Sequence, residues 1–452
     1  MNTIDNFDTY ARSMTHRLLK AAEADPATSM DERSTTVPRT VAMLVATLVL
    51  VAGLIVVGTS VLHIQFSHRP VNVATPPPVV TQAPTATPTT TPSPTVAPMS
   101  VIANLHMITT AVGWAQRQSD GAILHTTHGV MTWSVATPRI GIQDIIAVAF
   151  IDAETARALT AVIPPSGSSV IHSWATNDGG VTWIDEGSFS GISLQYEPDG
   201  TLDFVDPDHG WYSVTGLAAA GSSAIYVYRT VDGGRHWSEV DNTSIVPGPG
   251  ANALPSGCDK NPVSFINAVT GWDTGECAGG SAFLYVTHDG GAVWRAQSLG
   301  NTRSDGGNAI APPQFVSGNV GFMAESVYLQ AGVRTTVDVT TNGGATWAPR
   351  TAPGHYSDAS DFIDAADGWL LMSDPQSATV NETLWVTTDA GRTWANVPTN
   401  VNLAGLSIEF VTTKIGWAFT AIPESSGATQ GLLQTTDGGN TWTAVTPTIS
   451  GA

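Results

Sequence analysis

The chain has 452 residues, of which 42% are apolar and 12% charged, so it can bury the core of one large repeat domain or of about two to three average domains. The formal net charge is −20, and His63–Ala452 holds 32 acidic against 13 basic residues. That acidic balance, with no basic stripe to offset it, argues against nucleic acid or anionic lipid as a partner of the C-terminal part. Frequent Gly (44) and Trp (14) are typical of an all-β fold with many tight turns.

Residues 1–39 form a short polar segment whose apolar residues recur at roughly helical spacing. A small amphipathic helix is one interpretation, and it would dock a partner or lie on the membrane. A marginal helix is the other, because isolated helices of this length are weakly stable. The apolar positions are Ile4, Phe7, Ala11, Met14, Leu18 and Ala22.

Residues 40–62 (Thr40–Leu62) contain neither a charge nor a proline. As a helix this stretch would span roughly 34 Å, which matches the hydrocarbon core of a bilayer with some tilt. A buried globular helix and a cleaved signal peptide are the alternatives; the second is disfavoured by the 39 preceding residues and by the lack of a small-residue cleavage site. More basic residues precede the span than follow it, which predicts a cytoplasmic N-terminus, a single pass through the cell membrane and an extracytoplasmic C-terminal domain.

Residues 63–98 are predicted to be a disordered Pro/Thr-rich linker. Pro70–Pro98 contains nine prolines, eight threonines and no charged side chain, and such a composition favours extended segments over a packed core. The simplest role for the linker is a stalk that holds the next domain away from the bilayer.

From residue 99 onward the chain repeats itself with a period of about 50 residues. The clearest motif is Thr-x-Asp-Gly-Gly-x-Thr-Trp, here called the Asp box. Its seven copies are Thr126–Trp133, Thr176–Trp183, Thr230–Trp237, Thr287–Trp294, Thr340–Trp347, Thr387–Trp394 and Thr435–Trp442.

A second motif, a pair of aromatic residues seven positions apart, keeps step with the first. Its regular copies are Phe204/Trp211, Phe265/Trp272, Phe315/Phe322, Phe362/Trp369 and Phe410/Trp417. The first repeat has Met107 and Trp114 at these positions, and the second, the least regular, has Phe150 and Arg157.

Each period reads as four short strands, with the second motif on the first two strands, the Asp box at the turn between the last two and the Thr-Trp pair of the box at the start of the fourth. Both motifs are then expected on one face of the domain. Four-stranded units at this spacing predict an all-β fold, a single seven-bladed β-propeller over residues 99–452. A solenoid is the rival architecture, but solenoid repeats are shorter or helical.

The acidic residue of each box precedes the glycines at a turn, where a short carboxylate accepts hydrogen bonds from the following N–H groups. We therefore expect the box residues to have a structural role, and we expect no catalytic residue, no metal ligand and no cofactor. Box side chains that are spread one per repeat around a ring would not converge on one ion. The residues at the acidic position are His128, Asp178, Asp232, Asp289, Asn342, Asp389 and Asp437. The tryptophans expected to pack the blades are Trp133, Trp183, Trp237, Trp294, Trp347, Trp394 and Trp442.

The chain has two cysteines, Cys258 and Cys277. If Phe265 and Trp272 flank a hairpin centred near Ala268, position 258 lies opposite about 278, and a disulfide follows in an oxidising exterior. Two free buried thiols are the alternative.

The boxes resemble the bacterial neuraminidase (BNR) repeats, and the combined period is similar to the propellers of photosystem II stability and assembly factor-like proteins. The resemblance covers roughly residues 101–446. It implies a non-enzymatic scaffold that binds another membrane protein. Sialidases and xyloglucanases share the box, so a sialidase-like glycosidase is the alternative, which would need arginines and carboxylates converging in one central pocket.

Loop length points to one face as the binding surface. The connection from Trp237 to Phe265 is the longest, 28 residues against 15 for Trp347 to Phe362. Binding residues concentrate on loops held by a rigid scaffold. The sequence therefore places the contact for a protein or glycan on the face opposite the Asp boxes, centred on Asp241–Asn261 with Asp185–Asp199 beside it.

Overall fold

The computed structural model describes twelve stretches of the C-terminal part of the chain. They are residues 102–138, 144–162, 169–190, 200–218, 222–243, 253–277, 281–299, 308–329, 332–353, 356–373, 382–419 and 431–451. Within these stretches no helix is long and apolar enough to cross a bilayer. The predicted cytoplasmic segment, the span Thr40–Leu62 and the linker lie outside the described residues.

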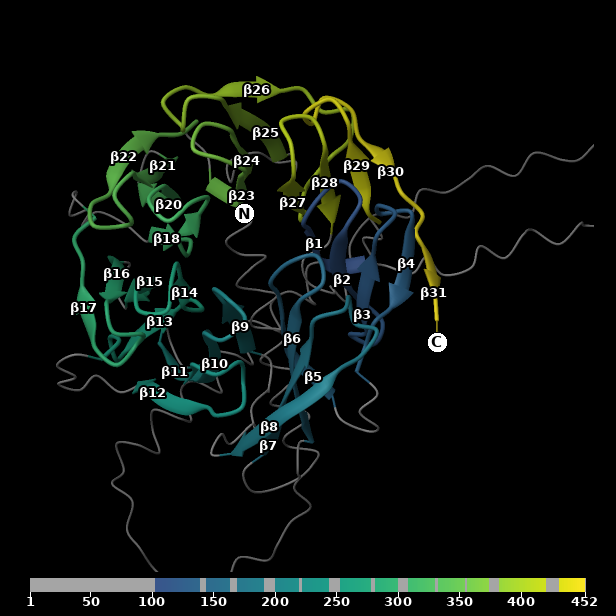
Figure 1. The fold of residues 1–452 in the computed structure, drawn as a ribbon. Helices are drawn as coiled ribbons and strands as arrows, with labels where there is room; N and C mark the ends of the chain where they lie inside the picture. Colours follow the sequence, from purple (N-terminus) through teal and green to yellow (C-terminus); the bar gives the residue numbers. More distant parts are fainter. Residues whose placement is uncertain are drawn as a thin grey trace, which may run out of the picture. The chain divides into compact units, whose positions relative to one another are not determined.

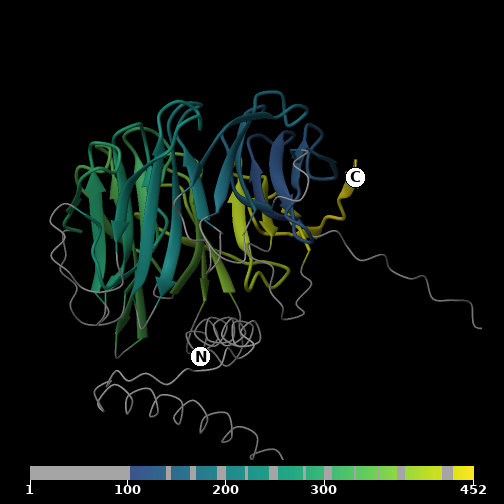
Figure 2. The same ribbon diagram turned by 90° about the horizontal axis from the view of Figure 1, so that it is seen from below.

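The described strands form seven antiparallel sheets, the blades, which follow one another around a ring (Figure 1). Within each blade the chain runs from the centre of the ring to its rim, so the first strand is innermost and the fourth outermost. The predicted seven-bladed propeller of four-stranded blades is confirmed. In Figure 2, which views the ring from the side, the strands run between two faces.

Blades 1 to 3 come from the first three repeats. Blade 1 consists of β1 (Ile102–Met107), β2 (Gly113–Arg117), β3 (Ile123–Thr126) and β4 (Thr132–Val135). Blade 2 consists of β5 (Asp144–Phe150), β6 (Ala156–Val162), β7 (Val170–Thr176) and β8 (Ile184–Ser190). Blade 3 consists of β9 (Gly200–Phe204), β10 (Gly210–Ala218), β11 (Ser223–Thr230) and β12 (Ser238–Thr243).

In blades 4 and 5 the innermost strand is split in two, because Pro262 and the pair Pro312-Pro313 have no N–H to give to the ladder. Blade 4 consists of β13 (Cys258–Lys260), β14 (Ser264–Phe265), β15 (Gly271–Cys277), β16 (Ser281–Thr287) and β17 (Trp294–Ala296). Blade 5 consists of β18 (Asn308–Ile310), β19 (Gln314–Phe315), β20 (Gly321–Leu329), β21 (Gly332–Thr340) and β22 (Ala348–Thr351).

Blades 6 and 7 are regular. Blade 6 consists of β23 (Tyr356–Phe362), β24 (Gly368–Ser373), β25 (Glu382–Thr387) and β26 (Ala395–Val397). Blade 7 consists of β27 (Ser407–Phe410), β28 (Gly416–Phe419), β29 (Leu433–Thr435) and β30 (Thr443–Ala444).

The last strand, β31 (Thr448–Ser450), closes the ring. It pairs in parallel with β4 of blade 1, with Thr448 opposite Thr132 and Ser450 opposite Ser134, and Figure 1 shows it on the outer side of that blade. The two ends of the repeat array are therefore joined by main-chain hydrogen bonds. The repeats contain no motif that predicts this fifth strand.

Neighbouring blades meet at seven joints, numbered here by the two blades they connect. In a regular joint the aromatic residue on the second strand of one blade stacks on the aromatic residue at the end of the first strand of the next. The ring centroids lie 3.6 Å apart for Trp211/Phe265, 3.8 Å for Trp369/Phe410, 3.9 Å for Phe322/Phe362, 4.9 Å for Trp272/Phe315 and 5.4 Å for Trp114/Phe150.

Two joints differ from this pattern. At joint 2/3 the guanidinium of Arg157 lies over the ring of Phe204, 5.7 Å from its centroid. At joint 7/1 Trp417 packs in one buried cluster with Met107. The second sequence motif thus builds the contacts between blades, and its irregular copies mark the irregular joints.

The two faces of the ring differ in the turns that they carry. The turn between strands 1 and 2 and the Asp box between strands 3 and 4 lie together, because a box N–H donates to a carbonyl of the other turn in every blade; in blade 4, for example, Gly290 N donates to Val269 O at 2.9 Å. We call this the motif face and the opposite one the loop face. The expectation that both motifs share one face is met.

The outermost strand begins later than the motif predicts. Most fourth strands start just after the box tryptophan, as β12 does at Ser238, and not at the Thr-Trp pair. The reason is that the Asp box holds the residue before the tryptophan in the turn: Asp232 Oδ1 accepts the N–H of His236 at 3.0 Å.

Candidate functional site

A groove of about 650 Å³ lies along the inner strands of blades 1, 2 and 3. Its walls come from consecutive residues of three strands, Ala103–His106 of β1, Ile145–Phe150 of β5 and Gly200–Phe204 of β9. Residues of the turn after β2, among them Gln118, complete it at the loop face. Its volume lies in the range of small-ligand sites.

The groove has mixed polarity. Apolar residues of β5 line it together with polar and charged residues of the other strands, such as Asn104, Thr201 and Asp203. At the loop-face end Arg117 forms a two-pronged pair with Asp120, with Nε 2.8 Å from Oδ1 and the terminal nitrogen 2.6 Å from Oδ2. This pairing leaves the arginine with little net attraction for an anionic ligand.

Asp203 lies at the other end of the groove and is half-buried. Burial raises the pKa of Asp203 to about 6, although its Oδ2 accepts the N–H of Phe265 at 2.9 Å, which opposes the shift. This aspartate therefore titrates near neutral pH.

His106, on the β1 wall, faces blade 7. Its Nδ1 lies 3.4 Å from Oε1 of Glu409. Burial lowers the pKa of His106, but the hydrogen bond to Glu409 and the charges of Glu409 and Asp361 outweigh burial and raise it. Burial also raises the pKa of Asp361 to about 6, against the hydrogen bonds that it accepts from Phe410 and Gln314.

The acidic box residues lie at the motif-face turns, one to a blade. In blade 4 Asp289 Oδ1 accepts the hydroxyl of Thr287 at 2.8 Å and the N–H of Val293 at 2.9 Å. The same bonds recur for Asp178, Asp232, Asn342, Asp389 and Asp437. Hydrogen bonds from Thr393 lower the pKa of Asp389 to about 2, so such a carboxylate is an ionised acceptor and not a proton donor.

The first box is different. Thr132 N donates to Gly129 O at 3.4 Å, and the structure shows no bond from Thr132 to His128, whose Nδ1 lies 3.0 Å from Thr127 Oγ1. Imidazole at this position does not replace the carboxylate as a double acceptor.

The box tryptophans stand edge-on to the inner phenylalanine of their own blade. Trp442 lies 6.0 Å from Phe410 and Trp294 6.1 Å from Phe265, both at steep interplanar angles. Contacts to the preceding blade also occur, as when Trp183 Nε1 donates to Ala136 O at 2.7 Å. Trp133, Trp237, Trp347 and Trp394 occupy the equivalent positions in their blades. The face-to-face stacks between blades come from the second motif, which the sequence analysis did not identify as the packing element.

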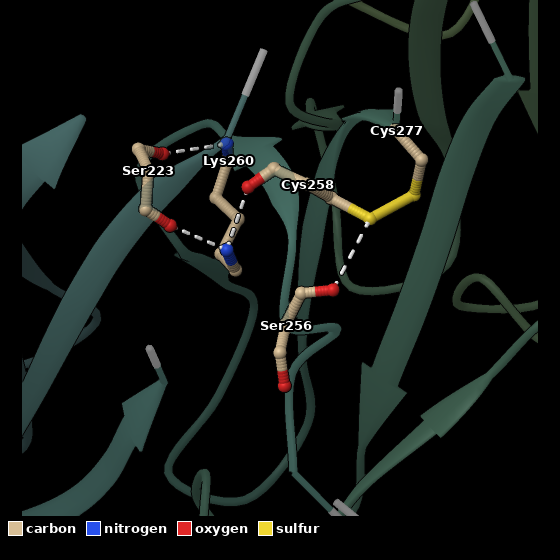
Figure 3. Close-up of a disulfide and its surroundings, with 5 residues drawn as sticks. All are labelled: Ser223, Ser256, Cys258, Lys260 and Cys277. Carbon is tan, nitrogen blue, oxygen red and sulfur yellow. Dashed lines mark hydrogen bonds between the residues drawn. A yellow bond between two sulfur atoms is a disulfide. The ribbon is translucent and has the colours of Figure 1, made fainter. Parts of the chain in front are cut away.

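Cys258 and Cys277 form a disulfide with an S–S distance of 2.03 Å, joining β13 to β15 (Figure 3). They are directly opposite, whereas a hairpin centred near Ala268 places residue 258 opposite 278; the inner strand is broken at Pro262, and the register shifts by one there. Ser256 O lies 3.9 Å from the Cys258 sulfur, a contact only, since a disulfide sulfur has no hydrogen to donate.

The described end of the long connection Asp241–Asn261 is anchored between blades 3 and 4. Leu254 is buried, and its N–H donates to Asp241 Oδ2 at 3.0 Å. Figure 3 shows the ammonium of Lys260 turned to the carbonyls of Ser223 and Cys258, at 2.6 and 2.7 Å. These residues staple blade 4 to blade 3, and they do not line the groove.

The groove does not hold the group of arginines that a sialidase-like site requires. Arg117 is the one arginine among the described residues that line the groove, and its guanidinium is paired with the carboxylate of Asp120. Across the same described stretches no cluster of three or more His, Cys, Asp or Glu side chains is arranged to hold a metal ion.

No protein-family model matches the chain, and no curated protein matches it in sequence. Among solved structures the chain is similar to YCF48 bound to a D1 peptide, with 15% identity, a TM-score of 0.42 and coverage of 75% of this chain and 94% of that one. It is also similar to the GH74 xyloglucanase of Xanthomonas campestris (14%, TM-score 0.48, 76% and 54% covered), of which it spans about half the length. A third is a Hadza microbial sialidase, at 13% identity and a TM-score of 0.36, with 61% and 63% covered. These likenesses concern the propeller fold.

Replacing Asp289 by Ala should lower the free energy of unfolding by about 1–2 kcal/mol, because the N–H of Val293 and the hydroxyl of Thr287 lose their acceptor. The matched control is His128→Ala in the first box, which should change stability by less than about 0.5 kcal/mol. Urea titration of the two variants measures the difference. Equal costs at the two positions would contradict the assigned role of the box carboxylate.

Replacing Asp203 by Asn should stabilise the protein at pH 7.5 and not at pH 4. A folded-state pKa of about 6, above the usual 3.8, adds stability that is present below about pH 4 and is lost as the pH rises through 6. Asn keeps an acceptor for Phe265 without the buried charge, so the gain at pH 7.5 is at most about 3 kcal/mol. Urea titrations of both proteins across pH 4–8 test this; a difference independent of pH would contradict it.

Proposed function

We propose that the chain is a membrane-anchored, extracytoplasmic β-propeller that acts as a non-catalytic binding or assembly scaffold and receives a protein partner in the groove of blades 1 to 3. The groove is the observation that carries the proposal. It is a concave surface of ligand size on a rigid ring, with walls of mixed polarity along three inner strands. Among the described residues that line it the one arginine, Arg117, is already paired with Asp120, which favours recognition over glycosidic chemistry.

Three features support a membrane anchor and an extracytoplasmic propeller. Thr40–Leu62 has the length and composition of a single span, and the basic residues gather before it. A Pro/Thr-rich linker separates the span from the propeller. The disulfide Cys258–Cys277 suits an oxidising compartment.

The first described residue of the propeller lies at the loop face, where the turn after β2 completes the groove. This residue, Ile102, is opposite Arg117, at the end of β1 away from the turn between β1 and β2. A partner that is itself in or near the membrane suits this arrangement, and YCF48, which was solved bound to a D1 peptide, is an example of a propeller that binds a polypeptide.

Protease added to the outside of intact cells should cut the linker at residues 63–98 and release the propeller, while an epitope tag placed before Met1 stays protected. This outcome follows from a cytoplasmic N-terminus and an unpacked stalk. Immunoblotting of the pellet and supernatant measures it. A cleaved tag together with a protected propeller would reverse the proposed orientation.

A photocrosslinking amino acid at Gln118, at the mouth of the groove, should capture a protein partner in the native membrane, whereas the same group at Val231 should not. Val231 is the matched control because it is exposed (55%) but lies on the motif face. Mass spectrometry identifies the adducts. Adducts from Val231 alone would instead favour a contact on the motif face. Release of the fluorophore from a fluorogenic sialoside by the purified protein would favour the glycosidase alternative.

A further inference from the structure

Five of the seven joints carry a hydrogen bond at the wall of the central channel, here called the inner belt. In each case the side chain that precedes the strand-1 aromatic reaches the main chain of the next blade. The bonds run from Phe265 N to Asp203 (2.9 Å), from Ser264 Oγ to Pro313 O (3.0 Å), from Phe362 N to Gln314 (3.1 Å), from Phe410 N to Asp361 (2.5 Å) and from Met107 N to Glu409 (2.8 Å).

The belt is interrupted at joints 1/2 and 2/3, where the corresponding residues are His106 and Ala149. The ring of His106 is stacked with that of Phe150, 6.4 Å between centroids, and its Nδ1 lies 3.4 Å from Glu409 Oε1 of the preceding blade, while Ala149 has no polar side-chain atom. Among the described residues no side chain accepts the N–H of Phe150 or of Phe204, the two groups that the belt would cover there.

Both joints are nevertheless tied at the motif face. Trp114 Nε1 donates to Asp152 O at 2.8 Å across joint 1/2, and Arg157 donates to Pro207 O at 2.9 Å across joint 2/3. Both joints are also packed by apolar side chains, and what they lack is the inner-belt bond. The stretch without that bond coincides with the groove, whose lining includes Ala149, Phe150 and Phe204.

The groove presents strand edges and not only side chains. Ile151 N donates to Thr155 O and Val205 N to His209 O within their own hairpins, so by alternation the N–H groups of Phe150 and Phe204 point away from their blades. Among the described strands, neither β5 nor β9 has a second strand partner. An unpaired strand edge is a template for another extended chain.

The charges select a neutral acceptor. Asp203 and Glu409 stand on the same channel wall, and the one arginine of the groove is neutralised by Asp120. The negative side chains of the wall would repel a ligand carboxylate, whereas they would not repel an uncharged main-chain carbonyl. A polypeptide carries such carbonyls at regular spacing and can lie beside a strand edge.

We propose that the groove binds one extended polypeptide segment of the partner, whose main-chain carbonyls accept the N–H groups of Phe150 and Phe204 and so complete the inner belt. This inference rests on the proposed function and adds the site and the mode of binding. Half-buried apolar residues of β5, such as Ile145 and Val148, would contact the side chains of the segment.

The test fills the open position in the belt. Ala149→Asp and Ala149→Asn each place an acceptor where Asp203 stands in the next blade, so the amide of Phe204 should exchange with deuterium at least tenfold more slowly than in the unsubstituted protein. The amides of Phe362 and Phe410, which the belt already covers, report that the ring is intact. An unchanged Phe204 amide in a folded variant would overturn the belt argument.

Binding is measured on the full chain in detergent, with heptapeptides selected from a random display library as probes. Both substitutions should weaken binding of the selected heptapeptides at least tenfold, and the neutral Asn variant separates capping from charge repulsion. Ala345→Asp, at an exposed box position of blade 5, is the matched control and should leave the affinity unchanged.

Two results would overturn the inference and leave the proposed function standing. In one, the Phe204 amide of the Ala149→Asn variant is protected from exchange but the variant binds the heptapeptides as tightly as before. The Phe204 N–H would then not be a contact of the peptide. The other is a failure of the library to yield any binder while the crosslinker at Gln118 still captures a protein. The absence of any protein crosslinked to the group at Gln118 would count against the proposed function.

Discussion

The structure depends on one contact, the stacking of an aromatic ring on the second strand of a blade against the ring that ends the first strand of the next. A four-stranded sheet alone leaves two apolar faces in water, and the ring of blades covers each face with a neighbour. At Trp211/Phe265, Trp369/Phe410 and Phe322/Phe362 the rings are nearly parallel, with interplanar angles of 4°, 1° and 2°. Because every blade both gives and receives such a contact, the propeller is held by repetition, and β31 joins its two ends.

The groove lies where this repetition weakens. At joint 2/3 the second-strand position holds an arginine, whereas the other joints have an aromatic residue there. Joints 1/2 and 2/3 also lack the inner-belt bond, because His106 and Ala149 occupy the positions that Asp203, Asp361 and Glu409 hold in other blades. Regular copies of the repeat therefore build the scaffold, and irregular copies leave main-chain groups available for a ligand. An aspartate with a pKa of about 6, Asp203, stands at the end of the groove, so the electrostatic character of the site changes near neutral pH.

The fold was predictable because two independent motifs share one period and each motif position has one physical role, since a carboxylate caps a turn and an aromatic ring fills a joint. The groove was not. Loop length directed the prediction to Asp241–Asn261, which stays a prediction because residues 244–252 lie outside the described ones; at its described end Leu254 and Lys260 are buried. The walls of the groove come from three strands about 50 residues apart, which only the closed ring brings together. The missing inner-belt bond depends on the lack of a polar side-chain atom at Ala149. The irregular second repeat was the signal that the sequence did contain. The strand β31 and the one-residue register shift at Pro262 depend on local geometry that no motif encodes.

The account is tested most directly by a double-mutant cycle on one joint. Trp369→Leu, Phe410→Leu and the double variant would be unfolded in urea, beside a second cycle that pairs Trp369→Leu with Phe265→Leu, two residues on blades that do not touch at this position. We expect a coupling free energy of about 1 kcal/mol for Trp369 and Phe410 and additivity for the distant pair. Additivity in both cycles would mean that the stacked rings do not hold the blades together, and would contradict the account.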